Sequence, residues 1–172
     1  MAFIDVRDGD GDNLERLFDL RPDVYAAWRQ LVTAVKATSD ERRYELATLA
    51  AARRLRSSYC SLAHGKVLAE RFYDFASVPM LPDGLEDADR AIMTFAEKIV
   101  ADATAVTQAD VEELRGHGLS DGEIFDVVLA ATIRCFFSKT LDALGVQADP
   151  EFAELDPAFR EPLTVGRPIE TA

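Results

Sequence analysis

Apolar positions recur every three or four residues through most of this chain, and the alternating pattern typical of strands is almost absent. Helix start signals interrupt the apolar pattern. Pro22 suits the first turn of a helix, and two capping pairs, Thr38 with Glu41 and Ser120 with Glu123, precede apolar runs. These signals predict an all-α fold. Helices are expected over residues 22–35, 39–55, 58–75, 86–103, 108–115 and 120–144.

The chain is expected to form one domain with two flanking segments. Its 172 residues, 48% of them hydrophobic and 29% charged, are enough for one well-buried core. An acidic N-terminal segment is expected over residues 1–20, the helical domain over residues 21–148, and an irregular tail over residues 149–172. The tail is expected to be irregular because it is acidic and contains prolines.

The charge of the chain narrows the classes of partner. There are 31 acidic and 19 basic residues, which give a formal net charge of -12. Long-range repulsion opposes binding to nucleic acid or to an anionic membrane, so a small molecule or another protein is the expected partner. The N-terminus lacks a basic stretch followed by an apolar one, and no apolar run approaches the ~20 residues of a membrane span. We therefore expect a cytoplasmic protein.

Neither a disulfide scaffold nor a metal or cofactor is expected. The two cysteines, Cys60 and Cys135, fall in separate predicted helices. Two histidines are too few for a typical histidine-built metal centre. The run Asp8–Asp12 resembles the start of a calcium loop, but Asn13 and Asp19 stand where such a loop has glycine and glutamate. A flexible acidic segment explains this run better.

The candidate chemistry is concentrated in Glu45, Ser57, Cys60 and His64. Cys60 and His64 stand four positions apart on one predicted helix, so they share a face. A helix that begins at position 57 or 58 places Cys60 in its first turn, where free N–H groups and the helix dipole stabilise a thiolate. Glu45 lies on an apolar stretch and needs a partner, such as a histidine that takes a proton from sulfur. Further positive potential is expected from Arg53, Arg54 and Arg56.

The same residues also fit a purely structural interpretation, which the local sequence leaves open. Free cysteine is among the most buried residue types, so Cys60 and His64 also suit a packed cysteine and a satisfied histidine. Glu45 also suits a surface salt bridge, and the arginines suit a solvated helix end. Cys135 lies within an apolar helix and is expected to be a core cysteine. Its alternative role as a distant resolving thiol requires a Cα separation below ~7 Å from its partner.

The spacing Glu45-x11-Ser57-x2-Cys60-x3-His64 resembles the signature of the carboxymuconolactone decarboxylase and alkylhydroperoxidase D superfamily. Redox members of that superfamily have Glu-x11-Cys-x2-Cys-x3-His, and this chain matches every position except the first cysteine, which is Ser57. The resemblance continues over residues 94–99 and 106–128, which look like the peroxidase-related branch. It implies a helical alkylhydroperoxidase D-like fold that assembles as a homo-oligomer: a dimer, a trimer or a hexamer.

This resemblance also implies roles for the four residues. Cys60 would be the peroxidatic cysteine, which attacks a hydroperoxide and becomes a sulfenic acid, with His64 as its base and Glu45 as the relay carboxylate. Ser57 takes the place of the resolving cysteine, but a hydroxyl cannot form a disulfide. The usual cycle, regenerated by a lipoyl-type dithiol, then lacks its resolving thiol at position 57. Three outcomes remain for an oxidised Cys60: resolution by an external thiol, resolution by Cys135, or no turnover.

Three functions are compatible with this resemblance. The first is an antioxidant, peroxidase-related oxidoreductase that uses a small peroxide and an external thiol. The second is a non-redox decarboxylase-like enzyme, in which His64 acts as acid and base on a carboxylate substrate and Arg56 is the nearest cation to hold it. The third is a catalytically degenerate, oligomeric binding protein with a buried, unreactive Cys60.

Overall fold

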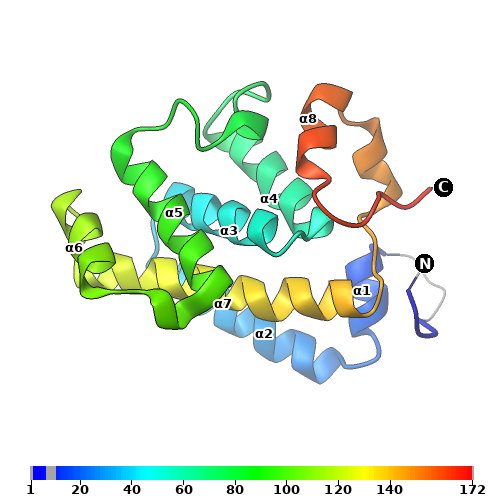
Figure 1. The fold of residues 1–172 in the computed structure, drawn as a ribbon. Helices are drawn as coiled ribbons and strands as arrows, with labels where there is room; N and C mark the ends of the chain where they lie inside the picture. The colour runs from blue at the N-terminus through cyan, green and yellow to red at the C-terminus, as the bar shows by residue number, and fades with distance from the viewer. Residues whose placement is uncertain (1, 7–10, 172) are drawn as a thin grey trace.

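The computed structural model describes residues 2–6 and 11–171, which contain helices and no strand, so the all-α prediction is confirmed (Figure 1). Positions 8–10 of the candidate calcium run lie outside the described residues. Among the described residues, no helix is both long and apolar enough to cross a bilayer. The α-helices are α1 (Asn13–Phe18), α2 (Pro22–Lys36), α3 (Glu41–Arg54), α4 (Ser58–Arg71), α5 (Asp87–Asp102), α6 (Gln108–Gly116), α7 (Asp121–Ala143) and α8 (Pro157–Leu163). The 3-10 helices are η1 (Val78–Met80), η2 (Ala103–Ala105) and η3 (Pro150–Glu154).

The core is built around α3, whose stretch from Tyr44 to Ala52 is entirely buried. This helix packs against α4, α5 and α7, and in Figure 1 it crosses the middle of the molecule. Its alanines leave room for the close approach of neighbouring helices. A helix that is buried on all sides explains the almost wholly apolar sequence of this stretch. The two polar exceptions, Glu45 and Thr48, therefore lie in the interior of the protein.

The predicted N-terminal cap is confirmed for α7 but not for α3. At the start of α7, the Ser120 N–H donates to Glu123 Oε2 over 2.8 Å, and Ser120 Oγ accepts the Glu123 N–H over 3.3 Å. In contrast, α3 begins after Asp40, whose carboxylate accepts a backbone N–H of the first turn over 2.9 Å. Thr38, the expected cap, instead donates its hydroxyl to the Val35 carbonyl at the end of α2. The carboxylate closer to the helix therefore replaces the predicted threonine as the cap.

The tail over residues 149–172, expected to be irregular, contains η3 and α8. Its prolines are a misleading signal, because Pro150 and Pro157 occupy the first turns of these helices, where a missing N–H costs little. Phe159 and Leu163 of α8 are buried. The ring centroids of Phe159 and Phe75 lie 4.9 Å apart. Phe75 lies beyond the end of α4, because this helix ends at Arg71 and not at residue 75 as predicted. The C-terminal segment is thus part of the packed domain.

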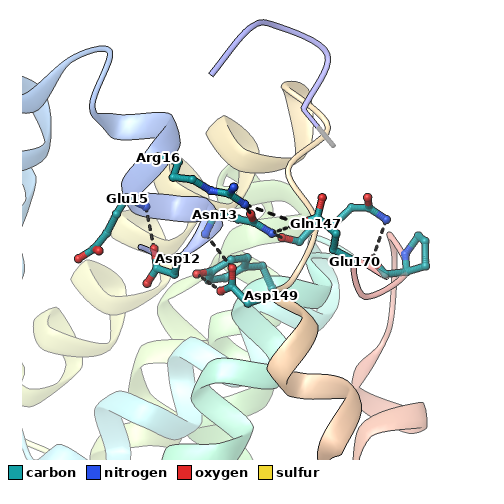
Figure 2. A network of polar contacts seen from close by, with 9 residues as sticks. Asp12, Asn13, Glu15, Arg16, Gln147, Asp149 and Glu170 are labelled. Carbon is teal, nitrogen blue, oxygen red and sulfur yellow. Dashed lines mark hydrogen bonds and ion pairs between the residues drawn. The ribbon is translucent and has the colours of Figure 1, made fainter. Parts of the chain in front are cut away.

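Polar contacts tie α1 and the C-terminal segment to the first turn of α4 (Figure 2). The Asp149 carboxylate accepts the Asn13 N–H over 2.7 Å and the Tyr59 hydroxyl over 2.8 Å. The Asn13 side chain donates to the Glu170 carboxylate over 2.7 Å. Asn13 begins α1, a helix that the apolar pattern does not predict within residues 1–20. Tyr59 directly precedes Cys60, so α1 and the segment that follows α7 are anchored beside the candidate thiol.

Candidate active site

Cys60 lies in the first turn of α4, three positions after the N-cap residue Ser57. Its side chain is 1% exposed and lines a cavity of about 360 Å³. The helix begins where the sequence pattern places it, and the free N–H groups of its first turn favour a negative charge on the sulfur. The cavity is a place where a small molecule can meet an otherwise buried thiol.

His64 lines the same cavity and pairs with Glu45 behind it. Nδ1 of His64 lies 2.5 Å from Oε2 of Glu45, and the other carboxylate oxygen accepts a hydrogen bond from Lys36 Nζ over 2.8 Å. Glu45 is 1% exposed, so both partners are needed to compensate for the burial of its charge. The structure thus brings together Glu45 and His64, which the sequence analysis selected, and adds Lys36 from the end of α2.

The protonation states of this pair follow from their surroundings. Burial by itself raises the pKa of Glu45, but the charge and hydrogen bond of His64 and the salt bridge with Lys36 lower that pKa to about 2. Burial and the positive charge of Arg134 lower the pKa of His64, although Glu45 acts in the opposite direction. At neutral pH His64 is therefore neutral, with Nδ1 donating to the ionised Glu45 and a lone pair left on Nε2. Such an imidazole can accept a proton from a group in the cavity.

Arg134 of α7 is a site residue that the sequence analysis did not select. Its side chain is nearly fully buried, and Nη1 donates to Cys60 Sγ over 3.3 Å. Among the described residues, Cys60 is its sole hydrogen-bond partner, and its guanidinium also lies 5.4 Å from the ring centre of Phe137. A buried cation without a carboxylate is costly, and a thiolate at Cys60 supplies the missing negative charge. The sequence signal for such a residue is a lone charge in an otherwise apolar helical run.

The arginines just before α4 do not surround Cys60, which corrects the expectation from the sequence. Arg53 donates hydrogen bonds to three backbone carbonyls within residues 78–81. Arg56 donates from Nε to the carbonyl of Val165 over 3.4 Å. None of the arginines at positions 53, 54 and 56 lines the cavity, so Arg56 is not the cation that would hold a carboxylate there. The positive charge at the sulfur comes from α7 instead.

Ser57 and Cys135 lie outside the cavity lining. Ser57 is fully buried at the start of α4, where its hydroxyl makes no capping hydrogen bond. Cys135 follows Arg134 on α7, so its side chain is turned about 100° from that cavity-facing position. Burial raises the pKa of the Cys135 thiol, and both thiols of the chain are free. Among the described residues, Cys60 is therefore the one cysteine that lines this cavity.

Cys60 and His64 face the same cavity without a direct hydrogen bond between them among the described residues. Their four-residue spacing on α4 brings both side chains to the cavity, but the polar group in contact with the sulfur is Arg134. A substrate oxygen could contact the sulfur on one side and the imidazole on the other. The arrangement can therefore separate two tasks: Arg134 stabilises negative charge on the sulfur, and Glu45 with His64 transfers a proton.

Comparisons with known proteins identify the fold. No family model matches the chain, and no curated protein matches it. A solved structure of a peroxidase-related protein from Ralstonia eutropha JMP134, described as an alkylhydroperoxidase AhpD core, superposes with a TM-score of 0.76 at 21% identity, over 91% of this chain and 83% of that one. This chain has the alkylhydroperoxidase AhpD-like fold. A peroxidase-related protein from Silicibacter sp. TM1040 agrees, with a TM-score of 0.75 at 19% identity over 82% of this chain and 78% of that one.

The same fold also carries another named activity. A cysteine-to-alanine variant of the debrominase Bmp8, in complex with 2,3,4-tribromopyrrole, superposes with a TM-score of 0.69 at 15% identity, over 88% of this chain and 80% of that one. Likeness at these identities establishes the fold alone. The predicted alkylhydroperoxidase AhpD-like fold is therefore confirmed.

Proposed function

We propose that this protein is a peroxidase-like oxidoreductase that reduces a small hydroperoxide at a single cysteine, Cys60. The observation that carries the proposal is the contact of 3.3 Å between Cys60 Sγ and the buried guanidinium of Arg134, inside a cavity large enough for a small molecule. A thiolate is the nucleophilic form of cysteine, and this contact favours it. The Glu45–His64 pair at the same cavity supplies a group that can accept and donate a proton.

In the first step, the Cys60 thiolate attacks the terminal oxygen of the hydroperoxide. An S–O bond forms while the O–O bond breaks, and the electron pair of the broken bond leaves with the alkoxide. His64 takes the proton that Cys60 loses and returns it to the alkoxide, which becomes an alcohol. Glu45 holds the imidazole and balances its transient positive charge. The sulfur is left as a sulfenic acid.

The second half of the cycle requires thiols from outside the protein. Ser57 cannot form a disulfide, and Cys135 lies outside the cavity lining. One external thiol condenses with the sulfenic acid to form a mixed disulfide and water. A second thiol then displaces the Cys60 thiolate and leaves as part of a disulfide. The reductant is therefore a thiol small enough to enter the cavity.

The test uses the Cys135→Ser variant, so that Cys60 is the single thiol of the protein. The alkylation rate of Cys60 is compared with that of a small free thiol at the same pH, and sulfenic acid is trapped with a dimedone-type probe after one equivalent of hydroperoxide. We expect Cys60 to be alkylated faster than the free thiol, and we expect one trapped adduct per chain by mass spectrometry. Alkylation no faster than that of the free thiol, with no trapped adduct, would contradict the proposal.

One observation favours a second candidate function. His64 and Glu45 form a complete acid–base pair that makes no hydrogen bond to Cys60 among the described residues. Such a pair can act on a non-redox substrate without the sulfur. A carboxylate substrate would have to displace Cys60 from Arg134 to meet a cation of the lining, because Lys36 is already paired with Glu45. The two candidates are separated by Cys60→Ser, which abolishes peroxide reduction and leaves a non-redox activity in place.

A further inference from the structure

The cavity beside Cys60 is walled by aromatic side chains from five elements: α2, α3, α4, α7 and η3. Attack on a peroxide needs a thiolate and a proton donor, and it does not need such a wall. Aromatic side chains at a cavity bind flat apolar groups by stacking and by burial of their surface. The six residues are Tyr25, Trp28, Tyr44, Tyr59, Phe137 and Phe152.

Several of these rings are held in place by one another. Trp28 stacks on Phe137 with ring centroids 4.3 Å apart and an angle of 20° between the planes. Tyr25 stacks on Trp28 at 6.0 Å, and Phe18 completes the group with stacked contacts to Tyr25 at 5.1 Å and to Phe137 at 5.7 Å. Rings that are already packed lose little conformational entropy when a ligand binds. The wall is therefore a preorganised surface for a further ring.

The charges at the cavity favour an uncharged ligand. Lys36 is paired with Glu45, and the Arg134 guanidinium contacts Cys60, so both cations of the lining already have partners. An anionic ligand would have to displace one of these partners, and it would also meet acidic groups. The acidic residues of the lining are Asp12, Asp149 and Glu151.

We propose that this cavity binds one uncharged, ring-bearing molecule against its aromatic wall, and that the substrate at Cys60 is an arylalkyl hydroperoxide rather than hydrogen peroxide. The substrate assignment rests on the proposed function, whereas the aromatic binding site does not. The volume of about 360 Å³ lies at the lower end of the ~300–1,000 Å³ range of small-molecule sites, which suits a single substituted ring. The Cys60 thiolate attacks the terminal oxygen while the O–O bond breaks, so the sulfur becomes a sulfenic acid. The alkoxide takes a proton from His64 and leaves as an arylalkyl alcohol.

The kinetic test compares cumene hydroperoxide with tert-butyl hydroperoxide, which has a methyl group where the first has a phenyl group. Rates of Cys60 oxidation are measured in Cys135→Ser and divided by the rates with a small free thiol, which removes the difference in intrinsic reactivity. We expect a preference of about tenfold for the phenyl compound. Trp28→Leu should reduce it to about twofold or less, and Trp28→Phe should retain most of it. Phe125→Leu, which removes an exposed ring of α7, is the matched control and should leave the preference unchanged.

Binding is measured separately through the fluorescence of Trp28, the sole tryptophan of the chain. The probe is 2-phenyl-2-propanol, the alcohol product, with tert-butanol as its control, and we expect a saturable change in emission with the phenyl alcohol alone. A saturable change in a protein whose Cys60 no hydroperoxide oxidises would support the aromatic site and overturn only the peroxidase function. The aromatic site is overturned if neither alcohol gives a saturable change in emission and any oxidation of Cys60 proceeds at equal normalised rates with the two hydroperoxides.

Discussion

The contact between Cys60 and Arg134 should appear as a coupling in the free energy of unfolding. At 3.3 Å, two unit charges attract by ~5 kcal/mol with an effective dielectric constant of about 20. Desolvation of the two buried groups offsets much of this attraction, so the expected net coupling is ~1–3 kcal/mol. A neutral thiol would give much less, because it is only a weak hydrogen-bond acceptor.

A double-mutant cycle measures this coupling. Cys60→Ala leaves the guanidinium buried without its hydrogen-bond partner, and Arg134→Met removes the charge but keeps a long, adaptable side chain. Urea unfolding is followed by circular dichroism at about pH 7.5 under reducing conditions. We expect Cys60→Ala to destabilise the wild-type background by ~2–4 kcal/mol and the Arg134→Met background by much less, because the uncompensated charge is then absent.

Additive effects at about pH 7.5, within ~0.5 kcal/mol, would refute the thiolate–guanidinium pair. Cys135→Ala combined with Arg134→Met is the control, since the adjacent sulfur makes no hydrogen bond with the guanidinium.

The acid–base pair and the missing cysteine can be tested in the same protein. Glu45→Gln should slow the oxidation of Cys60 by roughly 100-fold in stopped-flow assays at neutral pH, and an unchanged rate would exclude the relay. The pKa of His64 is lower in the folded protein than in the unfolded chain. Below about pH 6.5 the unfolded chain therefore binds a proton that the folded protein does not bind. As the pH decreases, the free energy of unfolding decreases by up to ~1.4 kcal/mol per pH unit. His64→Gln should remove this contribution from urea unfolding curves recorded between about pH 5 and pH 7. Ser57→Cys in the Cys135→Ser background should form a disulfide with Cys60 after peroxide treatment, seen as the loss of two alkylatable thiols, and a persistent sulfenic acid would show that the two sulfurs do not meet.

Local signals predict most of the helical architecture because they act within a single turn. The capping box of Ser120 and Glu123 and the proline at position 22 each start a helix where the pattern places it. The errors occur where two local signals compete. Asp40 replaces Thr38 as the cap of α3, and the prolines of η3 and α8 start helices instead of interrupting them. Only the burial of apolar side chains such as Phe159 distinguishes a packed helix from an irregular tail.

The candidate site is predictable to the extent that its residues share one helix. Cys60 and His64 reach the same cavity because they stand four positions apart on α4, and the start of that helix places the sulfur in its first turn. The apolar surroundings of Glu45 indicate that its carboxylate needs a partner, and His64 is that partner. Lys36 shares the same carboxylate, but nothing in the local sequence at the end of α2 points to it.

Local periodicity and capping were thus enough for the all-α class, the position of the sulfur at a helix start, and the face that it shares with His64. Contacts between helices distant in the chain settled the rest. Arg134 stands 74 positions from Cys60, and the aromatic wall combines rings from five elements. These contacts depend on the angles at which α2, α4 and α7 pack, which are set by the fit of whole helix surfaces and not by the pattern within any one of them.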